Sequence, residues 1–201
     1  MLVLGLTGSI GMGKTTTAQL FAQEGAKIFD ADAAVHELYA KSAIAPIAAR
    51  FPAAVVENAI DRAALAREIT ANPGALKDLE AIIHPLVRQA EVDFMAKCKA
   101  GKEKFVVLDI PLLFESGGDE LCDKTIVVTA SEDVQRQRVL ARSGMSVEKF
   151  EMLLSRQMSD EKKRALADFV VWTDKGIENA QTQVRAILTE LGLAAEKTSD
   201  A

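Results

Sequence analysis

A glycine-rich segment near the start of the chain restricts the possible folds more than any other feature of the sequence. It reads Gly8-Ser9-Ile10-Gly11-Met12-Gly13-Lys14-Thr15 and matches the spacing G-x-x-x-x-G-K-[ST]. An apolar run typical of a buried strand precedes it at about 2–7, and a helical pattern follows it from Thr16 to Glu24. A strand, a glycine-rich turn and a helix in this order predict a phosphate-binding loop (P-loop) in a parallel α/β sheet.

The residue types of this loop suit the phosphates of a nucleotide. Glycines let the backbone curl so that its N–H groups point inward, and the N-terminus of the following helix adds positive potential. Lys14 can reach the β- and γ-phosphates, while the hydroxyl of Thr15 can hold Mg²⁺. A lysine that follows a glycine-rich turn by chance is the alternative, but the flanking strand and helix favour phosphate binding. The predicted ATP-binding residues are Gly8, Ser9, Ile10, Gly11, Met12, Gly13, Lys14, Thr15 and Thr16.

Four further apolar runs rich in branched side chains follow at about 26–29, 105–109, 125–129 and 169–172. None shows the polar alternation of a half-exposed strand, so together with the first run they predict five buried strands. Helical spacing separates them, and this alternation predicts an α/β fold with a mostly parallel five-stranded sheet covered by helices on both faces.

The connection at about 31–103 is too long for a simple crossover and is predicted to form an inserted helical region. Apolar residues recur three or four apart over residues 76–90, as on the packed face of a helix. Asn72, before a proline, is expected to begin a helix there. Pro85 is expected to end that helix after His84 and to begin another, since proline suits the first helical turn.

A second long connection, at about 131–167, is highly charged and is predicted to form a solvated helical hairpin or lid. Ser131 is its expected N-cap, with acidic residues following in the first turn. The predicted domains are a nucleotide-binding core of 1–30, 104–130 and 168–193, a helical acceptor-binding region of 31–103, a lid of 131–167 and a frayed tail of 194–201.

Acidic residues stand at the ends of two predicted strands. Asp30 and Asp32 come at the carboxyl edge of the sheet, where open α/β proteins place their ligands. Asp32 is the candidate to orient an acceptor hydroxyl and accept its proton, but both residues could equally cap the next helix. Asp109 could hold Mg²⁺ through water or cap the turn before Pro111.

Basic residues of the two insertions are candidate phosphate contacts. Arg138 and Arg142 are four apart, so we expect them to share a helix face and to close over the transferring phosphoryl group. A solvated charged face is the alternative. His84 and Arg88, one helical turn apart, could contact an acceptor phosphate or face solvent. The histidines lack metal-ligand spacing, so no metal site made of protein ligands alone is predicted.

Composition excludes several classes of protein. A net charge of −5 argues against a broad nucleic-acid-binding face, which needs a surplus of Lys and Arg. Cys98 and Cys122 form no C-x-x-C pair, so neither a zinc site nor a disulfide framework is indicated. No apolar run approaches the roughly 18 residues of a membrane span. The sequence favours an unanchored cytoplasmic protein and gives no sign of an obligate protein partner.

On these residues alone, the chain is predicted to move the γ-phosphoryl group of ATP onto a small-molecule hydroxyl. Kinases of nucleoside monophosphates or of shikimate fit the same residues, because the P-loop and the arginines do not identify the acceptor. A nucleotide-dependent switch protein is disfavoured, because no second glycine-bearing switch motif follows Asp109.

Four phrases together resemble the dephospho-coenzyme A kinase family. They are GLTGSIGMGKT at 5–15, DADAAVHEL at 30–38, IIHPLVR at 82–88 and DIPLLFE at 109–115. Their order and spacing match the family, and QRQRVLAR, Arg156-Gln157-Met158 and ADFVV extend the resemblance to about residues 2–177.

The resemblance implies a fold similar to that of nucleoside monophosphate kinases, with an acceptor domain and a lid. It implies that MgATP phosphorylates the ribose 3′-hydroxyl of dephospho-coenzyme A, the last step of coenzyme A synthesis. Asp32 then corresponds to the base or orienter of that hydroxyl, and Arg138 and Arg142 to lid contacts with phosphates. His84 and Arg88 correspond to acceptor contacts.

One loop departs from the family's pattern. After the last strand the family usually reads close to V-I-x-N-x-G, whereas this chain has Val170-Val171-Trp172-Thr173-Asp174-Lys175-Gly176. Thr173 replaces the asparagine, and the glycine is displaced. The resemblance places this loop near the adenine of ATP, so it leaves the recognition of the base open.

Overall fold

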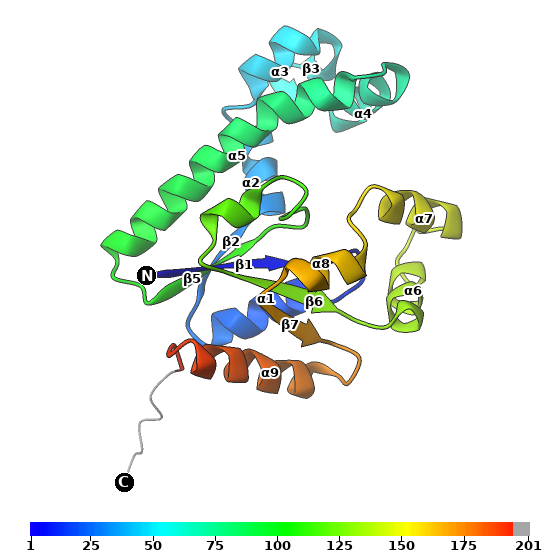
Figure 1. Cartoon of the computed structure of the whole chain (residues 1–201). Helices are drawn as coiled ribbons and strands as arrows, with labels where there is room; N and C mark the ends of the chain where they lie inside the picture. Colours follow the sequence, from blue (N-terminus) through cyan, green and yellow to red (C-terminus); the bar gives the residue numbers. More distant parts are fainter. Residues whose placement is uncertain (195–201) are drawn as a thin grey trace. The chain divides into compact units, whose positions relative to one another are not determined.

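The computed structural model describes residues 1–194, which fall into two compact units (Figure 1). The core unit consists of Met1–Phe29 and the described part of Cys98–Ala201, and the inserted unit is Asp30–Lys97. Apart from Ala194, the predicted frayed tail lies outside the described residues. No helix in the described part of the chain combines the length and the apolar character that crossing a membrane requires.

The central sheet of the chain has five strands in the order β2-β5-β1-β6-β7. Their bounds are Leu2–Thr7 (β1), Lys27–Asp30 (β2), Phe105–Asp109 (β5), Lys124–Thr129 (β6) and Phe169–Trp172 (β7). β1 pairs in parallel with β5 and with β6, and β6 pairs in parallel with β7. These strands confirm the five predicted from the apolar runs. β1, β5 and β6 are almost fully buried, which explains why they lack polar alternation, whereas the edge strands β2 and β7 are only partly buried.

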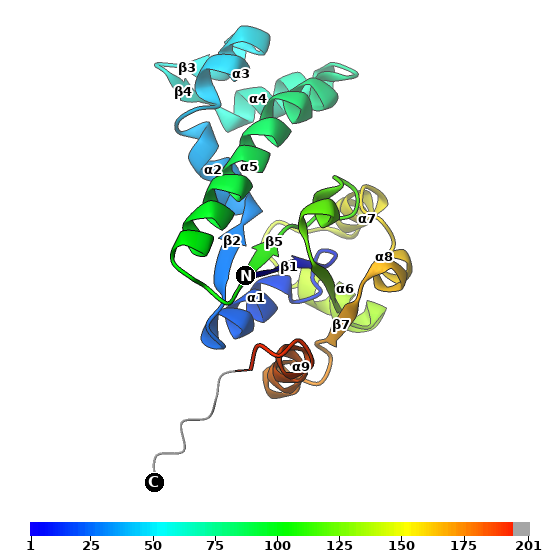
Figure 2. The same cartoon turned by 60° about the vertical axis from the view of Figure 1, so that its left-hand side comes forward.

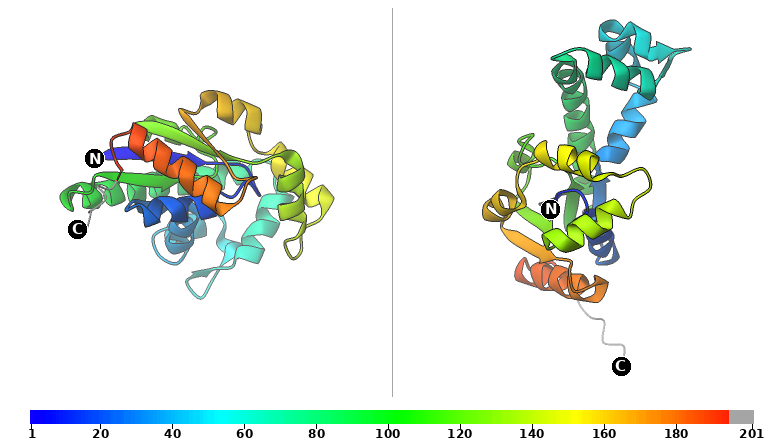
Figure 3. Two further views of the ribbon diagram at one scale, coloured as in Figure 1. Left: turned by 90° about the horizontal axis from the view of Figure 1, so that it is seen from below. Right: turned by 90° about the vertical axis from the view of Figure 1, so that its right-hand side faces the viewer.

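Helices of the core unit cover both faces of the sheet. α1 (Lys14–Gln23) and α9 (Ile177–Glu190) contact one another and share a hydrophobic core with the strands, in which Phe21 is fully buried. α8 (Asp160–Leu166) contacts β6 from the other face (Figure 3). α6 (Glu132–Leu140), α7 (Val147–Ser155) and the short 3₁₀ helix η2 (Gly118–Leu121) complete the unit.

The inserted unit has a hydrophobic core of its own. Its helices are α2 (Ala31–Tyr39), α3 (Ile44–Arg50), α4 (Arg62–Ala71) and most of α5 (Ala75–Ala100), and η1 (Pro52–Ala54) is a 3₁₀ helix. They pack around a cluster that includes Ile47, Phe51, Leu65, Leu79 and Ile83. This unit of Asp30–Lys97 lies where the sequence predicted a helical insertion of about 31–103.

A two-stranded hairpin in the inserted unit was not expected from the sequence. β3 (Val55–Val56) pairs antiparallel with β4 (Ala59–Ile60). Glu57 and Asn58 turn between them with φ of 49° and 60°, the two positive values of a type I′ turn. Asparagine tolerates this conformation, but a glutamate in the first position gives little signal of it.

The expectation that Pro85 separates two helices is wrong. α5 runs unbroken from Ala75 to Ala100 with Pro85 inside it (Figure 2). A proline inside a helix costs about 3 kcal/mol, since it removes one hydrogen bond and crowds the preceding turn. Pro85 is exposed, whereas Ile83 before it is buried and Leu86 after it packs against the same cluster. Apolar packing on both sides of the proline thus offsets its cost.

One predicted helix start and one predicted capping hydrogen bond also need correction. Asn72 ends α4, where its side-chain amide donates to the carbonyl oxygen of Glu68 over 3.0 Å, and α5 begins only at Ala75. Ser131 does precede α6, but its hydroxyl donates to Asp174 Oδ1 over 2.9 Å and does not cap the helix. In both cases a nearby oxygen accepts a hydrogen bond from the side chain, which therefore does not cap the start of a helix.

Candidate functional site

The P-loop joins the end of β1 to the start of α1. Gly8 must be a glycine because a Cβ there would lie 2.6 Å from the carbonyl oxygen of Val128 in β6. Gly13 precedes α1 with φ of 94°, a left-handed conformation that favours glycine. Met12 is buried between them, and its sulfur accepts a hydrogen bond from Ala130 N over 3.2 Å. The glycines of the motif therefore serve both a close approach and a backbone conformation.

Lys14 and Asp109 form an ion pair at the base of this loop. Asp109 ends β5 opposite Leu6 of β1, and only 5% of its side chain is exposed, against 15% for Lys14. A carboxylate buried to this degree needs a partner, and Lys14 supplies it. The sheet thus brings together the predicted phosphate lysine and the predicted magnesium carboxylate. Thr15 follows Lys14 in the first turn of α1, and its side chain is exposed.

The two acidic residues after β2 have different environments within the inserted unit. Asp30 Oδ1 accepts a hydrogen bond from Ala33 N over 2.9 Å and so caps α2. Asp32 lies in the first turn of α2 with its side chain exposed. The capping interpretation therefore holds for Asp30, while Asp32 presents a carboxylate to solvent at the helix N-terminus.

Arg138 and Arg142 do not share a helix face as predicted. α6 ends at Leu140, and Arg142 lies beyond it in a turn that leads to Gly144, whose φ is +72°. Arg138 is held by the loop after β7, donating to Thr173 Oγ1 over 2.8 Å and to the Thr173 carbonyl oxygen over 2.9 Å. Arg142 is exposed. Arg138 is thus hydrogen-bonded to the loop after β7, whereas Arg142 faces solvent.

The loop that departs from the family's pattern is tied to the P-loop. Thr173 is buried, and its hydroxyl lies 2.9 Å from the carbonyl oxygen of Met12 and 3.2 Å from that of Thr129. Asp174 accepts from the backbone N–H of Ser131 over 2.8 Å, and this bond lowers the pKa of its carboxyl. Thr173 therefore fixes this loop against the P-loop through its own hydroxyl.

His84 and Arg88 lie one turn apart on the continuous helix α5. His84 is exposed, and Arg88 Nη1 lies 3.8 Å from Glu91 Oε2. Glu91 is buried, and this burial raises the pKa of its carboxyl above the usual value of 4.5, although Arg88 acts in the opposite direction. Arg88 thus has a structural partner within the inserted unit.

Glu91→Gln should remove a pH dependence from the stability of the protein. Because the pKa of Glu91 is raised in the folded state, the folded protein holds this proton more tightly, and its ionisation destabilises the fold as pH rises above about 4.5. The parent should lose stability relative to Glu91→Gln as pH rises above about 4.5, until the raised pKa of the folded state has been passed. Urea unfolding of both proteins at several pH values measures this difference. Exposed Glu80→Gln is the control, and an equal pH profile for parent and Glu91→Gln would contradict the assignment.

Sequence reasoning missed several side chains around the P-loop. Gln135 Nε2 donates to the carbonyl oxygen of Ile10 over 2.8 Å, and Ile10 N donates to Gln157 Oε1 over 3.2 Å. Lys163 is fully buried and lies 3.0 Å from Glu115 Oε1. Gln157 and Glu115 occur within phrases that carry the resemblance, but the sequence gives no role for either.

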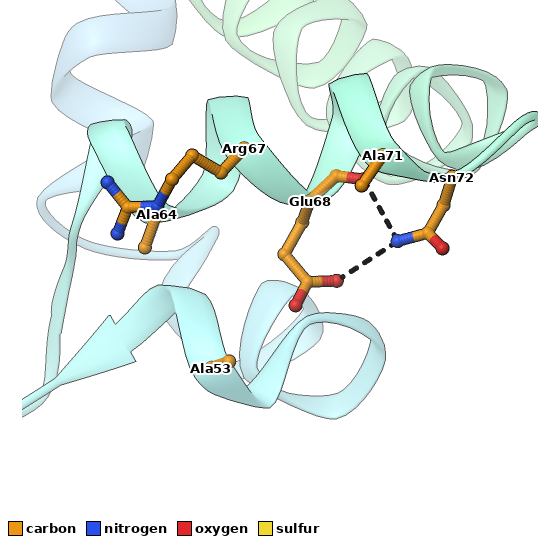
Figure 4. A pocket seen from close by; sticks show the side chains of 6 residues that line it. All are labelled: Ala53, Ala64, Arg67, Glu68, Ala71 and Asn72. Atoms are coloured by element: carbon orange, nitrogen blue, oxygen red, sulfur yellow. Dashed lines mark hydrogen bonds between the residues drawn. The ribbon is translucent and has the colours of Figure 1, made fainter.

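A small pocket of about 250 Å³ lies in the inserted unit beside α4 (Figure 4). Its lining residues are Ala53, Ala64, Arg67, Glu68, Ala71 and Asn72. The predicted acceptor contacts Asp32, His84 and Arg88 are not among these lining residues. Among the described residues, no group of three or more His, Cys, Asp or Glu side chains could hold a metal ion unaided.

Comparison with known proteins identifies the family. The family model for dephospho-CoA kinase matches residues 2–179. A dephospho-CoA kinase of Mesorhizobium japonicum is 52% identical over 191 residues, which cover 95% of this chain and 97% of that protein. The solved structure of TT1252 from Thermus thermophilus is 35% identical with a TM-score of 0.83, covering 94% of this chain and 97% of that one. The dephospho-CoA kinase of Campylobacter jejuni is 27% identical with a TM-score of 0.71, covering 94% and 96%.

These matches cover nearly the whole length of the chain and of its relatives, and they confirm the resemblance drawn from the four phrases. The P-loop, the buried pair of Lys14 and Asp109 and the five-stranded parallel sheet are consistent with them. The chain belongs to the dephospho-CoA kinase family.

Proposed function

We propose that the chain transfers the γ-phosphoryl group of MgATP to the ribose 3′-hydroxyl of dephospho-coenzyme A, giving coenzyme A and ADP. The observation that carries the proposal is the family match over residues 2–179, within which the P-loop is complete. The enzyme would act in the cytoplasm, without a nucleic-acid, membrane or obligate protein partner. Residues 31–103 would bind the acceptor, and residues 131–167 would form the lid.

The P-loop would hold the triphosphate of ATP. Its backbone N–H groups and the N-terminus of α1 would surround the phosphates, and Lys14 would exchange Asp109 for the β- and γ-phosphate oxygens. Once its ion pair with Lys14 is broken, the Asp109 carboxylate would hold Mg²⁺ together with the Thr15 hydroxyl. Bound there, the ion would offset the negative charge that develops between the β- and γ-phosphates. The oxygen donors of Thr15 and Asp109 are the ligand type that Mg²⁺ prefers.

Asp32 would accept the proton of the 3′-hydroxyl as that oxygen attacks the γ-phosphorus. The new O–P bond forms as the bond to the β–γ bridging oxygen breaks, and ADP leaves with that electron pair. The exposure of Asp32 and the assignment of capping to Asp30 support this role. His84 and Arg88 would contact the acceptor from α5.

The two lid arginines would contribute differently in the proposed reaction. Arg142 is exposed and would contact the phosphates when the lid closes, excluding water. Arg138 would reach the phosphates from its position on Thr173, where it also fixes the loop after β7. The transferring phosphoryl group would thus meet positive charge from Lys14 on the loop side and from the arginines on the lid side.

Arg142→Ala should lower kcat by about 10²-fold, because the equatorial phosphoryl oxygens lose a cationic hydrogen-bond donor in the transition state. The unfolding midpoint should change little, since an exposed charge contributes little to stability. Arg136→Ala, which removes an exposed arginine of the same segment, is the matched control. If the two variants turned over alike, Arg142 would have no special part in transfer.

The proposed function is tested by ADP formation from MgATP with separate acceptors. Dephospho-coenzyme A, AMP, CMP, shikimate and water would each be offered, and the product mass would be checked for one added phosphate. Turnover with dephospho-coenzyme A alone is expected. Turnover with AMP, CMP or shikimate would assign the protein to another kinase activity, and equal turnover with water would favour a nucleotide hydrolase or switch.

A further inference from the structure

Ile10, in the middle of the P-loop, is held on both sides by glutamines from the lid region. Its carbonyl oxygen accepts from Gln135 Nε2 over 2.8 Å, and its N–H donates to Gln157 Oε1 over 3.2 Å. Gln135 belongs to α6, and Gln157 lies in the short connection between α7 and α8. Two peptide groups of the loop are therefore satisfied from outside it, by residues more than 120 positions away.

Gln157 is fixed through its neighbour Met158. The backbone N–H of Met158 donates to Glu115 Oε1 over 2.7 Å, and the same oxygen lies 3.0 Å from Lys163 Nζ. Lys163 is fully buried, so its charge needs the carboxylate of Glu115. This pair makes the connection between α7 and α8 a fixed point of the core unit.

The same network reaches the strand that precedes the P-loop. Lys163 Nζ also donates to the carbonyl oxygen of Pro111 over 3.2 Å, and that oxygen accepts from Thr7 Oγ1 over 3.0 Å. Thr7 is the last residue of β1, directly before Gly8. Hydrogen bonds thus connect both the entry to the loop and its midpoint at Ile10 to the pair of Glu115 and Lys163.

α6 supports the loop from the other side. A Cβ at Gly11 would lie 2.5 Å from Val139 Cγ2 and 3.1 Å from the carbonyl oxygen of Gln135, so α6 packs directly against the loop. Arg138 is held in turn by Thr173, whose hydroxyl bonds Met12 O. Residues 10 to 12 of the P-loop are therefore held by α6, which ends before residue 141, and by Gln157 and Thr173, which lie after residue 156.

We propose that Gln157 is a positioning residue for phosphoryl transfer, which holds the Ile10 N–H and is itself fixed by Glu115 and Lys163. An anchored Ile10 keeps the neighbouring N–H groups of the P-loop preorganised for the phosphates, so the backbone of the loop need not rearrange when nucleotide binds. This inference rests on the proposed function only in taking the P-loop as the nucleotide site.

Gln157→Leu removes the acceptor while keeping the side chain's size. We expect affinity for Mg·ADP, measured by calorimetry, to fall about tenfold, which corresponds to about 1.4 kcal/mol. Hydrogen exchange of the Ile10 amide should become faster. The KM for ATP should rise while the KM for the acceptor stays near the parent's value. Gln137→Leu, an exposed glutamine of α6, is the matched control and should behave as the parent.

Two double variants test the support of Gln157 without leaving a buried charge. Glu115→Gln with Lys163→Met keeps an acceptor oxygen for Met158 N–H, and Glu115→Leu with Lys163→Met does not. The first should bind Mg·ADP nearly as the parent does, and the second should lose affinity as Gln157→Leu does. A purely structural role would instead move the unfolding midpoints of these variants and leave Ile10 exchange and nucleotide affinity unchanged.

Three results would overturn the positioning role of Gln157. Parent-like Ile10 exchange and Mg·ADP affinity in Gln157→Leu would overturn the positioning role, as would an equal loss in Gln137→Leu. If Gln157→Leu did not fold, equal affinity of the two double variants would overturn it instead. These readouts need no acceptor, so they stand even if the parent failed to phosphorylate dephospho-coenzyme A and the proposed function were wrong.

Discussion

Asp32→Asn is expected to lower kcat by about 10²- to 10⁴-fold, the usual contribution of a positioned general base. The asparagine can still hydrogen-bond the acceptor hydroxyl but cannot take its proton. Affinity for Mg·ADP should stay at the parent's value, because the P-loop is unchanged. The decisive measurement is single-turnover phosphorylation of dephospho-coenzyme A, together with calorimetric binding of Mg·ADP.

Asp30→Asn is the matched control for this variant. Asp30 is two residues away and caps α2, and asparagine caps a helix as well as aspartate does. Its turnover should therefore remain close to the parent's. Comparable losses in both variants would attribute the effect to the charge or stability of α2, and parent-like turnover of Asp32→Asn would exclude Asp32 as the base.

Lys14→Met is expected to reduce kcat by about 10²- to 10³-fold, because the γ-phosphoryl oxygens lose their lysine in the transition state. The variant should also lose about 3 kcal/mol of stability, since the buried carboxylate of Asp109 loses its ion pair with Lys14. Initial rates at saturating MgATP and urea unfolding measure the two effects separately.

Adding Asp109→Asn to Lys14→Met separates catalysis from stability. The double variant also removes the buried charge of Asp109, so most of the lost stability should return while turnover stays low. Recovery of turnover together with stability would mean that the single variant failed because its fold was damaged. Asp109→Asn alone should raise the Mg²⁺ concentration needed for half-maximal rate, if Asp109 holds the ion.

The sheet and the P-loop could be predicted from the sequence because their signals are local. Strands buried on both faces appear as short apolar runs, and the observed bounds differ from the predicted runs by about one residue. The loop motif combines glycines that a close backbone approach and a positive φ require with a lysine and a threonine in fixed spacing. Both patterns can be recognised from neighbouring positions, without knowing which distant segment lies nearby.

The errors occur where a local preference competes with a distant contact. Pro85 has the local character of a helix boundary, but packing of Ile83 and Leu86 in the inserted unit carries the helix through it. Serine is a good capping residue by type, yet the hydroxyl of Ser131 donates its hydrogen bond to Asp174 and not to the helix. The spacing of Arg138 and Arg142 predicted a shared face, but α6 ends between them.

The sequence by itself determined the order of the strands along the chain, the P-loop, and the residue types from which the phosphate site is built. Tertiary structure alone decided that Asp109 pairs with Lys14, that Thr173 bonds the P-loop, and that Gln157 and Gln135 hold Ile10. Backbone preferences act over a few residues, so the types of neighbouring residues predict them. A hydrogen bond between residues more than a hundred positions apart depends on the register of the sheet and the packing of helices, which no local pattern encodes.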